Sequence, residues 1–260
     1  KKLAIENNFF EHLNKYAVST LNLSKIKNFI IACIEEKEVK TKLTSKPYRI
    51  IIDPTNACNL GCPLCPTGLG QSQRTKGILK FDDFKKIINE AEDYCIELHL
   101  YNWGEPTLNK NLVEMLKYAK SKNIWTRISS NLSLKYKGDY VEKLIKSGLS
   151  LLHVDIDGID QDVYSKYRKK GDLNIVIDNL KKIKEIKKQN NLKEPIIELA
   201  MLAMKQNEHQ HKDFFNFAEQ LNADEIKIDK IQHNPNMDED WLPANKELIY
   251  KTYEGGKANS

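Results

Sequence analysis

The sequence predicts an α/β fold, a partial (β/α)6 TIM-like barrel with an N-terminal helical extension. Three observations carry this prediction. Short apolar runs alternate with amphipathic helical segments from Tyr48 onward, polar residues gather where the apolar runs end, and six such units are too few for a closed eight-unit barrel. A doubly wound parallel sheet fits the same count, and function gathers at the carboxyl ends of the strands in both folds.

The N-terminal stretch is predicted to be helical over residues 1–37. Its apolar side chains recur at the spacing of one helix face. They are Phe10, Leu13, Ala17 and Leu21, followed by Ile26, Ile30 and Cys33. A polar, lysine-rich connection over residues 38–47 follows and ends at Pro47. We therefore expect residues 1–47 to form an extension that packs on the main domain.

Predicted strands and helices alternate after this connection. Each predicted strand is a short apolar run, and each predicted helix carries apolar residues on one face. The strands are expected at residues 50–52, 96–101, 124–130, 149–156, 196–204 and 226–231. The helices are expected at residues 81–91, 112–119, 141–145, 176–186, 214–221 and 246–253. This alternation implies right-handed crossovers and a parallel sheet. We expect residues 48–235 to form the barrel and residues 236–260 a C-terminal helix and tail.

The net charge of +5 comes from scattered lysines, because only four of the 41 basic residues are arginines. Lysines interspersed with acidic residues are typical of solvated helix faces, whereas a phosphate-binding stripe recruits more arginine. No apolar run reaches the roughly 18 residues that a membrane span needs. The first ten residues lack the apolar core of a signal peptide. We therefore expect a cytoplasmic protein without a nucleic-acid or membrane partner.

Three of the five cysteines lie within eight residues, in the segment from Asp53 to Pro66. Cys58, Cys62 and Cys65 offer three soft thiolate ligands that converge when the loop curls. A closed zinc site or an ordinary [4Fe–4S] cluster requires four protein ligands, but the next cysteine, Cys95, is thirty residues away. Three ligands on a four-iron cluster leave one iron open for a substrate or cofactor.

The pattern Cys-x3-Cys-x2-Cys after Pro-Thr-Asn resembles the radical S-adenosylmethionine (SAM) superfamily over about residues 48–232. The resemblance implies that Cys58, Cys62 and Cys65 hold a [4Fe–4S] cluster whose open iron binds SAM. In the family, an electron from the cluster cleaves SAM, and the 5′-deoxyadenosyl radical abstracts hydrogen from a substrate. The resemblance therefore implies an enzyme that uses an electron donor of the flavodoxin or ferredoxin type.

Further residues match the family by their order and context, and the resemblance assigns them to parts of SAM. Gly104 and Glu105 take the place of the motif that grips the methionine ammonium, although Trp103 replaces its first glycine. Arg168 corresponds to the residue that meets the methionine carboxylate. Ribose contacts are implied for Ser130, Asn131 and Asp155, and adenine contacts for Leu64 and Leu202, the latter with Met204.

Each of these residues also has a structural interpretation. Gly104-Glu105-Pro106 is a common turn, and Asp155 and Asp157 suit loops that cap a helix near Asp160. Arg168 suits a surface ion pair, Leu202 and Met204 suit the core, and His233 and Asn234 suit either a substrate contact or a turn before Pro235.

The wider pattern resembles the branch of the family whose C-terminal extension carries auxiliary clusters. That branch contains peptide-modifying enzymes and dehydrogenases of sugars or aminocyclitols, so we expect a peptide or small-molecule substrate. No cysteine follows Cys95, so this chain supplies no cysteine for a second cluster. The sequence identifies neither the substrate nor a catalytic acid or base. Three alternatives are a non-catalytic module that binds zinc or an iron–sulfur cluster, a member that binds SAM without cleaving it, and a radical methyltransferase.

Overall fold

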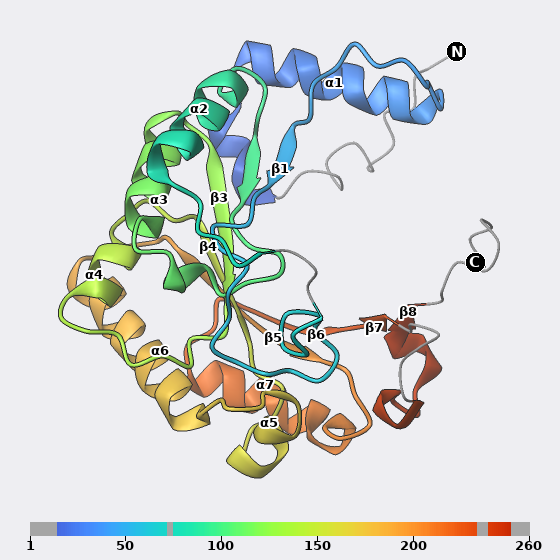
Figure 1. The fold of residues 1–260 in the computed structure, drawn as a ribbon, viewed down its shortest axis with the longest axis vertical. Coiled ribbons are helices and arrows are strands. Elements are labelled where there is room, and N and C mark those ends of the chain that lie inside the picture. Colours follow the sequence, from blue (N-terminus) through green and yellow to red (C-terminus); the bar gives the residue numbers. More distant parts are fainter. Residues whose placement is uncertain (1–14, 72–74, 233–238, 251–260) are drawn as a thin grey trace.

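The computed structural model describes residues 15–71, 75–232 and 239–250 (Figure 1). Its centre is a sheet of six parallel strands in the order β1-β2-β3-β4-β5-β6. The strands are β1 (Arg49–Ile51), β2 (Glu97–His99), β3 (Trp125–Ser130), β4 (Leu151–Asp155), β5 (Ile196–Leu202) and β6 (Glu225–Asp229). A doubly wound sheet would reverse its strand order part-way. The uninterrupted order therefore confirms the partial barrel, and every predicted strand is present.

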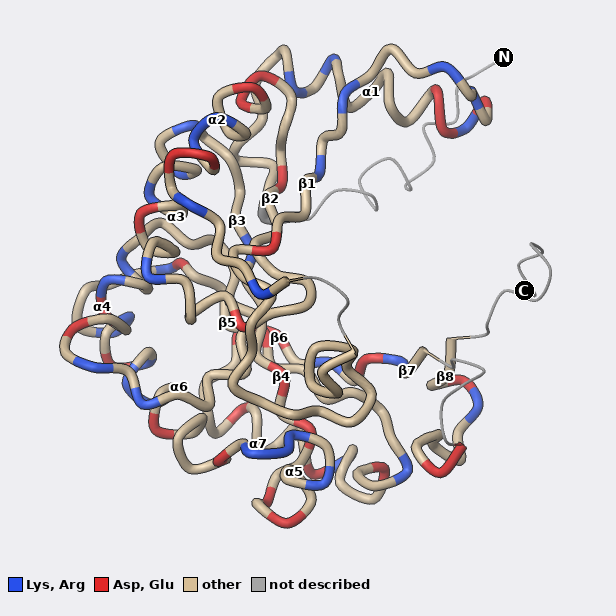
Figure 2. Tube along the Cα trace, viewed as in Figure 1, with Lys and Arg blue, Asp and Glu red and all other residues tan. Residues whose placement is uncertain are grey.

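Helices cover one face of this curved sheet (Figure 1). They are α2 (Phe81–Ala91), α3 (Leu112–Ser121), α4 (Tyr140–Ile145), α5 (Gln161–Tyr167), α6 (Leu173–Gln189) and α7 (His211–Gln220). Their apolar faces meet alternate strand residues such as Leu98, Ile128 and Leu152, all fully buried, in one continuous core. Figure 2 shows acidic and basic residues interspersed along these helices, as the sequence predicts for solvated faces.

The other face of the sheet carries charged side chains, because successive strand residues point to opposite sides. Arg127, His153 and Glu198 come from β3, β4 and β5, and their side chains lie within hydrogen-bonding distance of one another. Lys227 on β6 adds an ion pair of 3.3 Å to Glu198. The inner face of the barrel is therefore lined by a charge ladder, which we define as Arg127, His153, Glu198 and Lys227, with His153 and Glu198 buried at its centre.

The N-terminal extension consists of η2 (Lys15–Thr20) and α1 (Leu23–Lys37), and residues 1–14 lie outside the described residues. Asn22 caps α1 by accepting a bond of 2.9 Å from the backbone N–H of Lys25. Ala17 and Phe29 pack in one apolar cluster with Ile96, Trp125 and Leu151. Those three residues lie at the amino ends of β2, β3 and β4, so the extension covers that end of the barrel.

A fully buried lysine and a buried glutamate fasten the extension. Lys25 donates 2.7 Å to the carbonyl of Asn123, just beyond α3. Glu35 accepts four bonds from the connection, from the backbone N–H and the hydroxyl of both Thr44 and Ser45. The predicted connection is thus folded back onto α1.

The C-terminal part differs from the prediction. Residues 246–248 form one turn of 3-10 helix, η6 (Lys246–Leu248), and β8 (Ile249–Tyr250) then pairs with β7 (Ile231–Gln232). The predicted helix at 246–253 is wrong over these residues, because Ile249 packs beside Ile231 and its strand pairing replaces a further helical turn. His233, Asn234 and residues 251–253 lie outside the described residues. No helix in the described part of the chain is long and apolar enough to cross a membrane.

Candidate active site

The loop after β1 brings Cys58, Cys62 and Cys65 into one apolar cluster with Leu60 and Tyr167. The loop closes tightly, because a side chain at Gly68 would lie 2.4 Å from the carbonyl oxygen of Cys62. The end of α5 holds the loop from outside, since the Gly61 N–H donates 3.0 Å to the carbonyl of Lys169. No cysteine of the described residues forms a disulfide. The three thiols are therefore free and close together.

The three thiols are one ligand short of a closed tetrahedral zinc site, which takes four protein ligands. Within the described residues, the group of His, Cys, Asp or Glu side chains whose ligand atoms all lie within 4.8 Å of one another is His153, Asp155 and Asp229, and it contains no cysteine. A [4Fe–4S] cluster held by three thiolates keeps one iron open, so these thiols fit such a cluster better.

Burial favours the protonated form of Cys62 and Cys58. It raises the pKa of Cys62 to about 11 and also raises the pKa of Cys58. Arg168 opposes both shifts, because its positive charge favours the thiolates. Since thiolates are the form that ligates metal ions, metal binding here releases protons. The donor set of three thiols in a desolvated pocket fits a [4Fe–4S] cluster.

Glu105 joins the cysteine loop to the end of β3. Its carboxylate is buried and accepts from the hydroxyl of Ser130 at 2.8 Å and from the N–H of Asn131 at 2.8 Å. It also accepts from the N–H and the hydroxyl of Thr107, at 3.1 and 2.6 Å. Burial raises the pKa of Glu105, although these bonds oppose the shift. Glu105 is therefore a hub of the local structure, and its predicted contact with the methionine ammonium stays a prediction.

Gly104 allows the turn after β2 to touch the cysteine loop. A side chain at this position would begin 1.8 Å from the carbonyl oxygen of Thr55. The next residue, Glu105, donates its backbone N–H to the carbonyl of Ala57 at 2.8 Å. Asn131 completes the junction, because its amide donates 3.0 Å to Asn59 and lies 3.8 Å from the Cys58 sulfur. Gly104, Glu105, Ser130 and Asn131 thus surround the loop.

Asp155 and Asp157 hold Arg168 between them. The Arg168 Nε donates 2.5 Å to Asp157, and its Nη2 lies 3.6 Å from Asp155. Asp157 also accepts 2.8 Å from the backbone N–H of Leu202, so it is fixed on two sides. Burial would raise the pKa of Asp155, but His153 and Arg168 hold it well below the usual range of a carboxyl group. Arg168, with a side chain 14% exposed, is thus an oriented and largely covered cation rather than a surface ion pair.

The apolar residues predicted to meet adenine lie beside the cysteines. Leu64, Leu202 and Met204 belong to the same apolar cluster as Cys62. Trp241 from the C-terminal segment packs in the same cluster, with its ring centroid 5.7 Å from that of Tyr167. The structure therefore places apolar surface, a cation and three thiols along one edge of the barrel.

Sequence reasoning missed two residues of this region. Ser129, and not Ser130, points into the barrel, where its hydroxyl donates 3.2 Å to Asp155. His153 lies two residues before Asp155 on the same face of β4 and contacts it at 3.0 Å. The alternation of side chains along β3 and β4 is the signal that identifies both, once the outward face is known.

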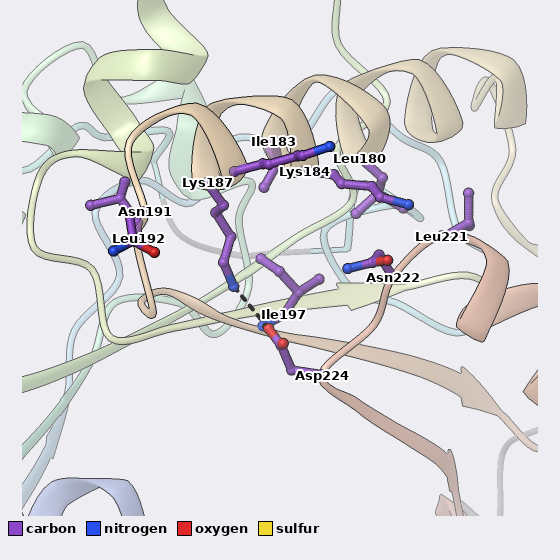
Figure 3. Close-up of a pocket in the computed structure, with 11 residues that line it drawn as sticks. Leu180, Ile183, Lys184, Lys187, Asn191, Leu192, Ile197, Leu221, Asn222 and Asp224 are labelled. Atoms are coloured by element: carbon purple, nitrogen blue, oxygen red, sulfur yellow. Dashed lines mark hydrogen bonds and ion pairs between the residues drawn. The ribbon is translucent and has the colours of Figure 1, made fainter.

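A separate cavity of about 430 Å³ lies between α6, the start of β5 and the end of α7 (Figure 3). Leu180, Ile183 and Ile197 form its apolar wall, and the ion pair of Lys187 with Asp224, at 2.9 Å, crosses its rim. This cavity lies at the amino ends of β5 and β6. It is therefore distinct from the cysteine edge, where the carboxyl ends of the strands meet.

Fold and site together define a class of protein, a partial α/β barrel with a loop of three free thiols at the carboxyl edge of its sheet. Residues 52–218, more than half of the chain, match the Radical SAM superfamily. The chain belongs to this superfamily, as its cysteine motif predicts. Members use a [4Fe–4S] cluster and S-adenosylmethionine.

Individual relatives are distant. The PqqA peptide cyclase of Bradyrhizobium diazoefficiens is 26% identical over 206 residues, which cover 77% of this chain and 50% of the relative. The GTP 3′,8-cyclase of Desulforamulus reducens is 24% identical over 173 residues, which cover 65% and 51%. The crystal structure of Streptococcus suis SuiB bound to S-adenosylmethionine matches with a TM-score of 0.62 at 16% identity, covering 86% of this chain and 58% of SuiB. The chain thus spans about half the length of these relatives.

Proposed function

We propose that this chain is a radical SAM enzyme in which Cys58, Cys62 and Cys65 hold the [4Fe–4S] cluster. One observation carries the proposal: three free thiols lie in one apolar cluster, and the positive charge of Arg168 acts on two of them, Cys58 and Cys62. When bound, the cluster supplies the electron that cleaves SAM to methionine and a 5′-deoxyadenosyl radical. The radical then takes hydrogen from a substrate, and a low-potential donor of the flavodoxin or ferredoxin type supplies the electron to the cluster.

The chain's own residues would bind and orient SAM. Arg168, held by Asp157, suits the methionine carboxylate, because a guanidinium binds carboxylates through two parallel bonds. Asp155 suits the ribose hydroxyls as an acceptor. Leu64 and Leu202 offer apolar surface to the adenine. Glu105 and Gly104 suit the methionine ammonium, and Ser130 and Asn131 hold Glu105 in place.

The contribution of Cys62 is tested by Cys62→Ala with reconstitution of the cluster under anaerobic conditions. We expect about four irons per wild-type chain and cleavage of SAM to 5′-deoxyadenosine under dithionite. Cys62→Ala should lose both, because two thiols leave a second iron without its protein ligand. Cys33→Ala is the matched control and should keep both, since Cys33 lies on α1 in the N-terminal extension. About eight irons per chain would contradict a single cluster, and iron retained by Cys62→Ala would contradict the ligand assignment.

We propose a peptide as the substrate class. Two relatives support this choice by their names and contents: PqqA peptide cyclase, and SuiB, which was also crystallised with its precursor peptide SuiA. GTP 3′,8-cyclase is the reason to keep a small molecule as the alternative. A short precursor peptide encoded beside this gene, co-expressed with the chain, should change mass by mass spectrometry in a Cys62-dependent way. Sugar-processing genes in that position would favour the small-molecule alternative.

The structure offers no support for a radical methyltransferase that uses Cys95 as the methyl acceptor. Cys95 is fully buried just after α2, and burial raises its pKa to about 12. It also lies at the amino end of β2, whereas the cysteine loop lies at the carboxyl end. A thiol in such a place is an inert core residue.

A further inference from the structure

The imidazole of His153 is buried between two carboxylates on neighbouring strands. Its Nε2 lies 3.0 Å from Oδ1 of Asp155, and its Nδ1 lies 2.5 Å from Oε1 of Glu198. The register places His153 directly beside Glu198 on β5 and Ser129 on β3. A carboxylate oxygen only accepts, so both ring nitrogens must carry a hydrogen to donate in both directions. The geometry is that of an imidazolium with two anionic partners.

The rest of the barrel interior explains why a charged histidine is tolerated there. Charged groups face His153 from every strand packed against it. Four of them lie beside the imidazole: Arg127 on β3, Asp155 on β4, Glu198 on β5 and Asp229 on β6. Lys227 on β6 interacts with it through Glu198, and Arg168 does so through Asp155. Burial alone would lower the pKa of His153, but Asp155 and Glu198 outweigh it and raise the pKa to about 9. The imidazolium is therefore the form present at neutral pH.

The contacts of these residues argue against a metal site. His153, Asp155 and Asp229 lie close enough together to bind one divalent cation. However, protein cations already neutralise both carboxylates: Arg168 pairs with Asp155, and Lys227 lies 3.5 Å from Asp229. Both nitrogens of His153 are also engaged. The group is an internal ion-pair network that ends at the SAM site.

We propose that His153 is a positioning residue that fixes the carboxylate of Asp155 for the ribose of SAM. The inference rests on the proposed function, because it takes Asp155 as a ribose-binding residue. One oxygen of Asp155 is bound by His153, and the other accepts from Ser129 and lies near Arg168. The carboxylate is thereby held from both sides, while the Asp155 side chain remains 23% exposed. Without His153, Asp155 would turn toward Arg168, and the orientation needed for two hydroxyl groups would be lost.

The test measures the equilibrium affinity for SAM by calorimetry on anaerobic chains that carry four irons. His153→Gln should weaken SAM binding about tenfold, the size of one charge-assisted hydrogen bond. It should have no further effect in an Asp155→Asn background, because His153 acts through Asp155. A merely structural role would instead lower the thermal midpoint and add its effect to that of Asp155→Asn. His209→Gln is the matched control, an exposed histidine given the same change, and should bind SAM like the wild type.

The pH dependence gives a second readout. SAM affinity of the wild type should fall as the pH rises through about 9, because a neutral imidazole donates to only one of its two carboxylates. The His153→Gln variant should lack this protein-dependent fall. The amino group of SAM titrates equally in every sample, so only the difference between two profiles reports on His153. If His153→Gln does not fold, Glu198→Gln serves instead, and it should move the fall in affinity to lower pH.

The outcomes separate the inference from the proposed function. If the four-iron wild type neither binds SAM nor forms 5′-deoxyadenosine, the proposed function fails. If it binds SAM and Asp155→Asn weakens binding, but folded His153→Gln binds normally, only the inference fails. An unchanged profile in Glu198→Gln also overturns the inference. So does a bound divalent metal that His153→Gln removes.

Discussion

At single positions, the site depends on backbone contacts as much as on chemistry. The turn after β2 requires a glycine at position 104, because the carbonyl of Thr55 occupies the space that a side chain would need. Glu105 then bonds to the loop through its backbone and to β3 through its carboxylate. A motif that the sequence assigns to SAM therefore also joins two strand ends to each other.

Gly104→Ala should destabilise the fold. The new methyl group would begin 1.8 Å from an oxygen, so the backbone of one loop must move. Overpacking of this kind costs about 1–3 kcal/mol, which corresponds to a thermal midpoint lower by about 2–12 °C for a chain of this size. Thermal unfolding followed by circular dichroism measures the change. Gly77→Ala is the matched control, since the new Cβ atom would lie 4.0 Å from its nearest neighbour, the carbonyl oxygen of Thr75. An equal effect in both variants would refute the role of close approach.

Single residues also show why part of the site was out of reach of the sequence. The cysteines can be identified in the sequence by residue type and spacing. In the structure, Asn131 contacts Cys58, and Glu105 bonds to the cysteine loop. The charge of Arg168 acts on Cys62, and Asp155 lies against Arg168. Ser129 and Ser130 are chemically identical, and only the direction in which the strand faces tells them apart. The charge ladder has the same cause, because its members are far apart in sequence and meet only through the register of four strands.

Among the secondary-structure elements, α1 has an attachment that depends on one ionised carboxylate, that of Glu35. Glu35 accepts four hydrogen bonds from Thr44 and Ser45, and the side-chain bond from Ser45 is the largest cause of a pKa lowered from 4.5 to about 2. A carboxyl group whose pKa is lower in the folded state stabilises the fold above its unfolded pKa, and this contribution is lost as the pH falls through the folded value. The contact between α1 and the connection should therefore loosen between about pH 4.5 and pH 2.

Glu35→Gln should lower the thermal midpoint at neutral pH, because a neutral amide accepts these bonds more weakly. The difference between the variant and the wild type should shrink as the pH falls from 4.5 toward 2 and vanish below pH 2. Thermal unfolding at several pH values measures both effects. Glu38→Gln, an exposed change near the end of the same helix, is the control and should follow the wild type at every pH. A difference that kept its neutral-pH size at pH 2 would contradict the mechanism.

Elements with a strong local pattern were predictable, and those defined by their partners were not. The amphipathic helix at Phe81–Ala91 has the predicted bounds, because its apolar spacing and acidic first turn act locally. Residues 246–250 have helical propensity too, but pairing of β8 with β7 decides their structure. The division of the chain at residues 47 and 235 stays a prediction.

For the molecule as a whole, the region of family similarity and the folded unit have different limits. The match begins at residue 52, but Ala17 and Phe29 are as deeply buried as the barrel's own residues. Trp125 and Leu151, each 1% exposed, pack in one cluster with these two residues of the extension. The sequence before the family region thus covers the amino end of the barrel.

A chain shortened to residues 48–260 would carry every proposed cofactor ligand. It would also expose an apolar surface to water at the amino ends of the strands, where Ala17 and Phe29 now pack. We expect such a fragment to associate or precipitate, whereas the longer chain stays monodisperse under the same conditions in size-exclusion chromatography. Replacing Trp125 with a smaller residue in the full chain should not reproduce this behaviour, because the N-terminal extension would still cover the apolar surface. The segment before the region of family similarity is therefore needed to keep the amino end of the barrel covered.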